Sequence, residues 1–246
     1  TGIWGKKALS EAKRLGFSCH VAASSEANGH TAVPDEASLS ITNDAAYLHY
    51  TSNETIGGLE FDYTPQITRA DGAAVPLVCD MSSNILSGPI DISDFGVVYA
   101  GAQKNIGPAG LTIVVVRDDL LGKAPSTIPS LFDYQMLAEA GSMVNTPPTY
   151  AIYITGLVLE WLKKKGGLAE IEKINISKAN LLYDLIDTTD FYHCSVAKSD
   201  RSRMNIPFAL KNTNLDAEFL KQAQDRGLIQ LRGHRAVGGM RASIYN

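Results

Sequence analysis

The order of apolar and polar residues in the first half of the chain alternates between a helical and an extended period. Residues 5–15 predict a helix of three turns, because one helical face carries Ala8, Leu9, Ala12 and Leu15. Short apolar runs bounded by polar or glycine-containing segments then predict strands at 17–22, 45–50, 75–80, 97–100 and 111–116. The runs at 75–80 and 111–116 are almost continuously apolar, as expected for strands covered on both faces in a mainly parallel sheet.

Long amphipathic patterns replace the strands after residue 150. They predict helices at 151–165 and 168–186, the second with an apolar face at Ile171, Ile174, Leu182 and Leu185. A strand at 205–211, a helix at 215–226 and a strand at 228–231 follow. We therefore expect an α/β fold: a large domain at 1–170 with a mainly parallel sheet flanked by helices, and a smaller α+β domain at 171–246.

Composition and charge restrict the possible partners. The 246 residues are 45% hydrophobic and carry a net charge of -4, which gives no general attraction for nucleic acid or an anionic membrane. No run reaches the roughly 18 to 20 apolar residues of a membrane helix. Three cysteines far apart in sequence favour a reducing compartment, so we expect a cytoplasmic protein. The chain lacks an initiator Met and a leader, and we expect both natural ends to be missing.

Two residues at predicted strand ends are candidates for chemistry. Asp80 ends the strand at 75–80, where ligands of open α/β sheets bind, although an aspartate there often only caps a turn. Lys104 lies in a glycine-rich turn between two predicted strands, and the alternative is a lysine on a surface loop. Together they match a pyridoxal phosphate site, which needs an amine for the aldehyde and an anion for the pyridinium nitrogen. No metal site is predicted.

Five blocks of sequence resemble the phosphoserine aminotransferases, a branch of the class V pyridoxal-phosphate-dependent aminotransferases, in the same order along the chain. The blocks are residues 50–58 (YTSNETIGG), 80–84 (DMSSN), 101–110 (GAQKNIGPAG), 144–149 (VNTPPT) and 233–243 (GHRAVGGMRAS). The resemblance covers essentially the whole chain. It implies fold type I, the large-plus-small domain arrangement of these pyridoxal phosphate enzymes.

The resemblance also implies roles for individual residues. Lys104 would carry the cofactor and move the proton at the substrate α-carbon, while Asp80 would keep the pyridine nitrogen protonated. Thr55 would bond the phenolic oxygen and Trp4 would stack on the ring. Without the family, a turn hydroxyl and a core tryptophan are the simpler interpretations of Thr55 and Trp4.

The remaining implied contacts involve anions and a second subunit. Gln103 would bond the cofactor phosphate from one subunit, and Asn145 with Thr146 from the other, so the resemblance implies a homodimer with shared active sites. Arg241 would bind the substrate α-carboxylate. The substrate-phosphate pocket would include His234 and Arg235, which singly could be surface charges.

The implied reaction is a ping-pong transfer between L-glutamate and 3-phosphohydroxypyruvate, giving O-phospho-L-serine and 2-oxoglutarate in serine biosynthesis. The family chemistry extends to a 4-phosphohydroxy-L-threonine step of pyridoxine biosynthesis. Two alternatives stay open. One is another class V enzyme, such as an alanine–glyoxylate-type transaminase or a cysteine desulfurase, although Cys194 lies in no matching motif. The other is an inactive, truncated fragment that binds a partner.

Overall fold

A four-stranded sheet organises the first half of the chain in the computed structural model, which describes residues 2–246. Its strands, in spatial order, are β1 (Leu48–Thr51), β4 (Leu77–Asp80), β5 (Val97–Gly101) and β6 (Thr112–Val116). β1, β4 and β5 are parallel, which confirms the mainly parallel sheet, and β6 runs antiparallel to β5. β6 is an edge strand of this sheet among the described residues. Val114 and Val115, which point to opposite faces, are 37% and 41% exposed, so this strand is not covered on both faces as predicted.

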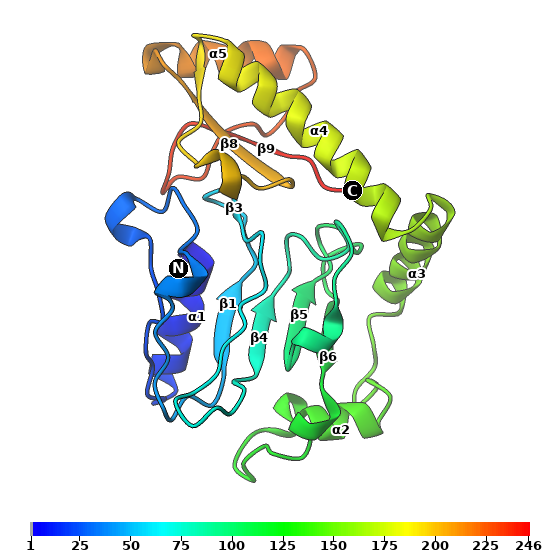
Figure 1. Cartoon of the computed structure of the whole chain (residues 1–246). Helices are drawn as coiled ribbons and strands as arrows, with labels where there is room; N and C mark the ends of the chain where they lie inside the picture. Colours follow the sequence, from blue (N-terminus) through cyan, green and yellow to red (C-terminus); the bar gives the residue numbers. More distant parts are fainter. Residues whose placement is uncertain (1) are drawn as a thin grey trace.

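Alternation along β4 directs Leu77 and Cys79 to a buried face, while Val78 and Asp80 on the opposite face are partly buried. Leu77 and Cys79 point into a cluster with Met81, Phe95 and Val98, all of them buried. Helix α1 (Ile3–Arg14) lies beside β1 in Figure 1, and helix α2 (Tyr134–Glu139) lies near β6 at the lower end of the sheet. This close-packed cluster fixes one face of the sheet, and the polar Asp80 remains at the carboxyl end of β4.

Two predicted strands are wrong. Residues 17–22 form no strand, and their described backbone is irregular up to the short 3₁₀ turns Glu26–Asn28 and Glu36–Ser38. Residues 228–231 are also irregular, with Leu228 and Ile229 exposed. Apolar runs of this length become strands only when a neighbouring strand supplies hydrogen-bond partners, and residues 17–22 have no such strand among the described residues. The run at 228–231 meets a neighbouring strand only at its end, where the Leu231 carbonyl accepts from the Arg241 amide at 2.7 Å.

A short hairpin follows β1 and reaches the second part of the molecule. It pairs β2 (Asn53–Glu54) with β3 (Leu59–Glu60) in antiparallel register. Gly58 closes its turn at φ +70°, where a Cβ would lie 2.2 Å from a side-chain carbon of Pro207. Glycine is required there both for the left-handed backbone and for the close approach to the neighbouring strand.

The second part of the chain is a three-stranded antiparallel sheet covered by helices. Its strand order is β7 (Tyr192–His193), β8 (Asn205–Leu210) and β9 (Met240–Ser243), and helices α4 (Leu168–Thr188) and α5 (Asp216–Asp225) pack against it. Helix α3 (Thr149–Lys164) instead contacts α4 and the turn after β5. The sequence pattern did not predict β7 and β9, which are short and polar. The boundary proposed at residue 170 stays a prediction, and it falls inside α4.

The buried face of α4 matches the predicted one only in part, since Ile171 is buried and Leu182 packs against the core as predicted. Its buried residues are Ile171, Asn175, Ala179, Tyr183 and Ile186. Ile174 and Leu185 are instead about half exposed, at 45% and 49%. Small and polar residues allow α4 to approach the β8–β9 sheet closely, so the helix is rotated relative to the position that apolar residues alone predict.

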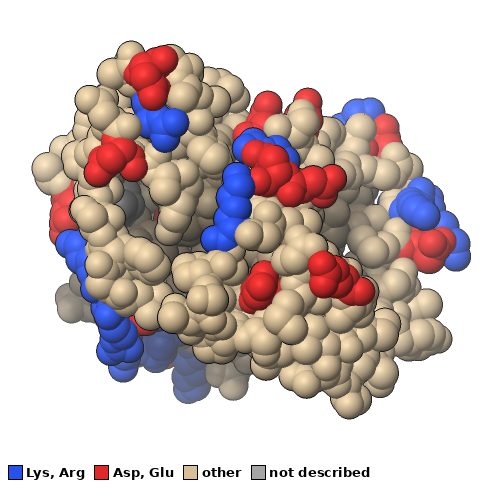
Figure 2. Space-filling view, turned by 90° about the horizontal axis from the view of Figure 1, so that it is seen from below, with Lys and Arg blue, Asp and Glu red and all other residues tan. Residues whose placement is uncertain are grey.

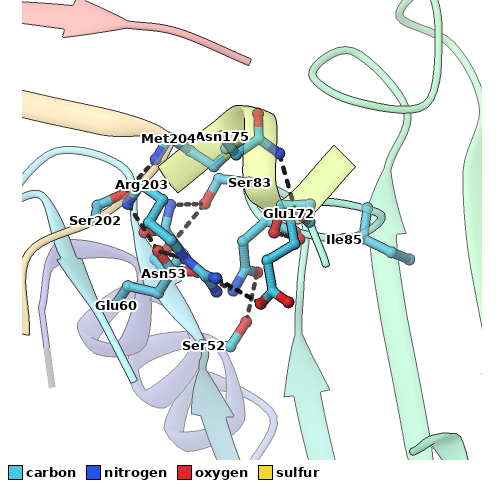
Figure 3. Close-up of polar contacts among 12 residues, drawn as sticks. Ser52, Asn53, Glu60, Ser83, Ile85, Glu172, Asn175, Ser202, Arg203 and Met204 are labelled. Carbon is cyan, nitrogen blue, oxygen red and sulfur yellow. Dashed lines mark hydrogen bonds and ion pairs between the residues drawn. The ribbon is translucent and has the colours of Figure 1, made fainter. Parts of the chain in front are cut away.

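Buried polar side chains connect the two sheets (Figure 3). The Asn53 amide donates to Ser83 Oγ at 2.7 Å and to Asn205 Oδ1 at 2.9 Å. Beside it, Arg203 bonds Glu60 at 3.1 Å and Glu172 at 2.8 Å. Buried amides need such partners, so this network fixes the hairpin against both β4 and β8.

We expect Asn205→Ala to lower the free energy of unfolding by about 1–3 kcal/mol, because it leaves the buried Asn53 amide without one of its partners. Urea unfolding followed by circular dichroism measures the change. Asn180→Ala, on the exposed side of α4, is the matched control and should change the value by less than about 0.5 kcal/mol. Equal effects of both substitutions would contradict the structural role of Asn205.

Candidate active site

The carboxyl ends of three parallel strands meet at one edge of the large sheet. Thr51 ends β1, Asp80 ends β4 and Gly101 ends β5, and this edge faces the β8–β9 sheet in Figure 1. Ligands of open α/β sheets bind at such an edge. The fold therefore brings the two residues selected from the sequence, Asp80 and Lys104, to the same part of the molecule.

A tight turn after β5 presents Lys104. The Ala102 carbonyl accepts bonds from the amides of Ile106 at 3.2 Å and Gly107 at 2.8 Å, and both Ala102 and Ile106 are fully buried. Gly107 packs against α3, where a Cβ would lie 2.7 Å from Thr155 Oγ1. Buried residues on both sides of the lysine hold the turn, so its direction is set by the core.

Lys104 is half-buried, and its ammonium is surrounded by charges of both signs. Its Nζ donates to Thr55 Oγ1 at 3.0 Å. Burial lowers the pKa of Lys104, Arg241 lowers it further, and the carboxylates of Asp80 and Glu54 raise it. A lysine with a lowered pKa has more neutral amine near neutral pH, and the neutral amine is the nucleophile that reacts with aldehydes.

Asp80 acts as a cap and still offers a free oxygen. Its Oδ1 accepts from the backbone amide of Ser82 at 2.9 Å and from the Ser82 hydroxyl at 2.6 Å. Ser82 Oγ also accepts from the Gly101 amide at 3.1 Å, which links the aspartate to the start of the lysine turn. Oδ2 has no hydrogen-bond donor among the described residues, so the cap leaves one oxygen for a ligand.

The strand face around Asp80 carries two further polar residues. Tyr99 pairs with Asp80 across the sheet, and its hydroxyl lies 2.9 Å from His49 Nε2. Burial lowers the pKa of His49, and the charge of Asp80 opposes that change. Sequence reasoning missed both residues, because nothing in the sequence shows that His49 and Tyr99 share a face with Asp80.

Arg241 joins the second sheet to this site. It lies on β9, and its guanidinium donates to the Thr55 carbonyl at 3.2 Å. Its Nε is buried and has no hydrogen-bond partner. A buried guanidinium nitrogen without a partner is costly in the free protein, and a carboxylate is the ligand that would satisfy it.

Trp4 reaches the same region through its backbone. Its amide donates to Glu54 Oε2 at 3.3 Å, and Glu54 is the residue before Thr55. The indole is partly exposed, with 37% of Trp4 accessible and Lys7 Nζ 4.5 Å from the ring centre. The structure thus joins Trp4, Thr55, Lys104 and Arg241 in one connected set of contacts.

Five predicted site residues lie on the surface of the single chain. They are Gln103, Asn145, Thr146, His234 and Arg235, all exposed. Gln103 neighbours the lysine in the same turn, while Asn145 and Thr146 lie between α2 and α3. Their assignment to the site stays a prediction, and an exposed position is what residues of a shared site would have before the second subunit is present.

The arrangement is suited to chemistry on an amine and a carbonyl compound. It combines a lysine whose pKa burial lowers, a carboxylate with an open oxygen and an arginine with an unsatisfied donor. The sequence pattern of the family described as "Aminotransferase class-V" matches residues 2–246. A phosphoserine aminotransferase of Nitrosomonas europaea is 61% identical over the whole chain, which covers 67% of that protein. The chain belongs to the phosphoserine aminotransferase branch of the class-V aminotransferase family.

Solved structures of phosphoserine aminotransferases have the same fold. The enzyme from Bacillus circulans subsp. alkalophilus superposes with a TM-score of 0.95 at 47% identity, covering all of this chain and 66% of that one. The pyridoxal-phosphate-bound enzyme from Trichomonas vaginalis gives 0.91 at 39% identity, covering all of this chain and 69% of that one. The chain therefore spans about two thirds of the length of these aminotransferases and adopts the fold-type I arrangement that its sequence motifs predict.

Charge substitutions around Lys104 should move its pKa in opposite directions. Asp80→Asn removes a charge that raises the pKa, so the pH midpoint for labelling Lys104 with an amine-reactive reagent should fall. Arg241→Gln removes a charge that lowers it, so the midpoint should rise. Peptide mass spectrometry across a pH series measures both without any cofactor. Shifts in the same direction would contradict the assigned electrostatics.

Proposed function

We propose that this chain catalyses the phosphoserine aminotransferase reaction. An amino group moves between L-glutamate and 3-phosphohydroxypyruvate, giving O-phospho-L-serine and 2-oxoglutarate in two half-reactions. The observation that carries the proposal is the position of Lys104, bonded to Thr55 and within the electrostatic influence of Asp80 and Arg241. The 61% identity to a phosphoserine aminotransferase supports the same conclusion.

The residues present fit pyridoxal phosphate. The chemistry this cofactor supplies when bound is an aldehyde that captures amines and a protonated pyridine ring that withdraws electrons. Lys104 provides an amine with a lowered pKa, and Asp80 provides an open carboxylate oxygen on a neighbouring strand. Trp4 supplies a flat, partly exposed indole, and the Thr55 hydroxyl supplies a hydrogen bond for the phenolic oxygen.

Three residues of the chain have separate roles in proton transfer. Asp80 would keep the ring nitrogen protonated, because a carboxylate at contact distance stabilises the cationic form. Lys104 would act as base and acid within each half-reaction: its amine would take the proton from the substrate α-carbon and deliver it to the carbon of the cofactor's aldehyde group, and the second half-reaction would run this transfer in reverse. Thr55 positions the Lys104 nitrogen, which it contacts at 3.0 Å.

Two anionic groups of the substrate need separate partners. Arg241 is suited to the α-carboxylate, because its buried Nε lacks an acceptor and a guanidinium pairs with a carboxylate through two parallel bonds. His234 and Arg235 are suited to the substrate phosphate. They lie on the loop before β9, and both are exposed, so the phosphate group of a substrate can reach them from solvent.

A second subunit is part of the proposal. Figure 2 shows the face at the α2 end of the sheet, where basic and acidic residues are scattered over a mainly uncharged surface. Large apolar side chains in the segment from residue 130 through α3 are strongly exposed, with Phe132 at 67%, Met143 at 63% and Tyr150 at 73%. Such exposure favours a protein partner, and a homodimer would bring Asn145 and Thr146 to the other subunit's cofactor phosphate.

The proposed partners include neither nucleic acid nor a membrane. The net charge is -4, and within residues 2–246 no helix is long and apolar enough to cross a bilayer. The three cysteines, Cys19, Cys79 and Cys194, are all free thiols, which supports a cytoplasmic location. Burial raises the pKa of Cys194, which does not favour the alternative of a cysteine desulfurase.

The decisive test uses the visible absorption of pyridoxal phosphate joined to Lys104. Protein incubated with the cofactor should show that band, and L-glutamate should convert it to the near-ultraviolet absorption of pyridoxamine phosphate. Lys104→Ala should abolish the band because no other amine takes its place. Lys123→Ala, an exposed lysine remote from the site in sequence, is the control and should leave the band intact. A band that survives in Lys104→Ala would contradict the assignment.

Mixed dimers test the shared site. Lys104→Ala and Thr146→Asp should each be nearly inactive, the second because a carboxylate repels the cofactor phosphate. When the two variants mix at random, half of the dimers are heterodimers. Each heterodimer has one intact site out of two, so activity should recover to about a quarter of the wild-type value. Lys104→Ala mixed with Gln103→Asp is the control and should stay inactive, since both residues serve the same subunit's site. No recovery in the first mixture would contradict the shared site.

A further inference from the structure

Helix α1 receives its N-terminal cap from a residue fifty positions along the chain. The N-cap residue is Gly2, which has no side chain to accept a bond, and the first turn contains no acidic residue. The Glu54 carboxylate instead accepts from the amide of Trp4 at 3.3 Å and from that of Gly5 at 3.0 Å. These are the second and third residues of the helix, whose amides an N-cap side chain normally satisfies.

The packing around Glu54 leaves no room for another cap. A Cβ on Gly2 would lie 2.3 Å from the carboxyl carbon of Glu54 and 2.6 Å from Cγ. Glu54 is only 5% exposed, and as a carboxylate at the positive end of the helix it is placed favourably. The glycine and the glutamate are therefore complementary, since the small residue admits the side chain that replaces its cap.

Glu54 also connects α1 to the lysine. The next residue, Thr55, accepts a bond from Lys104 Nζ through its hydroxyl and from Arg241 through its carbonyl. The charge of Glu54 raises the pKa of Lys104. The dipeptide Glu54-Thr55 thus contacts the first turn of α1, Lys104 and Arg241, and it fixes their relative positions.

We propose that Glu54 is a positioning residue, which places the Trp4 indole for stacking by capping α1 from outside the helix. The inference rests on the proposed cofactor site. Loss of the cap frees the first turn of the helix, so Trp4 moves relative to Thr55 and Lys104. The cofactor ring then loses a fixed stacking partner.

The first measurement is made without cofactor. In a Trp161→Phe background Trp4 is the sole tryptophan of the chain. Glu54→Ala should raise the acrylamide quenching of its fluorescence roughly twofold, because an uncapped first turn frays. Glu11→Gln, exposed on the same helix, is the matched control and should leave quenching unchanged. If Glu54→Ala does not fold, Glu54→Gln, which keeps one acceptor oxygen, should give an intermediate value.

The second measurement tests whether a new N-cap side chain at position 2 compensates for the loss of Glu54. In Glu54→Ala the space beside Gly2 is open, and Gly2 already has the extended backbone of an N-cap residue. Adding Gly2→Asn supplies a neutral cap and should restore most of the protection of Trp4 fluorescence from acrylamide quenching. It should also restore most of the pyridoxal phosphate affinity, which we expect Glu54→Ala to weaken roughly tenfold. A charge effect on Lys104 alone would not be rescued by a neutral asparagine.

The outcomes separate the two proposals. Unchanged Trp4 quenching in Glu54→Ala, or a failure of Gly2→Asn to restore it, would overturn the positioning role of Glu54. If the wild-type chain itself does not bind pyridoxal phosphate, the proposed function fails, and the quenching series still tests the cap. Weaker cofactor binding with changed quenching and successful rescue supports both.

Discussion

The side-chain amide of Asn53 is the contact on which the geometry of the site depends. It is 1% exposed and donates both to Ser83, just after β4, and to Asn205, at the start of β8. A buried amide that loses its partners costs more than an ordinary hydrogen bond contributes, so this pairing tolerates little displacement. Thr55 and Glu54 follow Asn53 directly and therefore inherit a fixed position between the two sheets.

The electrostatics of the site follow from that constraint. Thr55 contacts Lys104 through its hydroxyl and Arg241 through its carbonyl, so two cationic groups are held on one residue. Their mutual repulsion and burial favour the neutral amine of Lys104, while the carboxylates of Asp80 and Glu54 oppose this effect. A chain with a net charge of -4 thus contains a local site suited to anions, and overall charge would not have indicated it.

Sequence reasoning predicted the sheet and placed Asp80 and Lys104 at its edge for a physical reason. Apolar runs that end at Asp80 and precede Lys104 carry both the fold signal and the position of the site, since ligands bind where parallel strands end. Contacts such as that of Glu54 with α1 join residues fifty positions apart, and no local period encodes them. The same limit explains residues 17–22, which have no neighbouring strand among the described residues, and residues 228–231, which meet β9 only at Leu231. It also explains β9, whose pairing with β8 no local pattern encodes.

The distribution of exposure divides the predicted site into two groups. Thr55 is buried, and Asp80, Lys104 and Arg241 are partly buried and linked by hydrogen bonds or charge within one chain. Asn145, Thr146, His234 and Arg235 lie on exposed loops, away from this set of contacts. Proton transfer demands groups fixed by a rigid core, whereas phosphate recognition by flexible side chains can be completed by a second surface. The first group is therefore built by the fold of one chain, and the second is suited to assembly between chains.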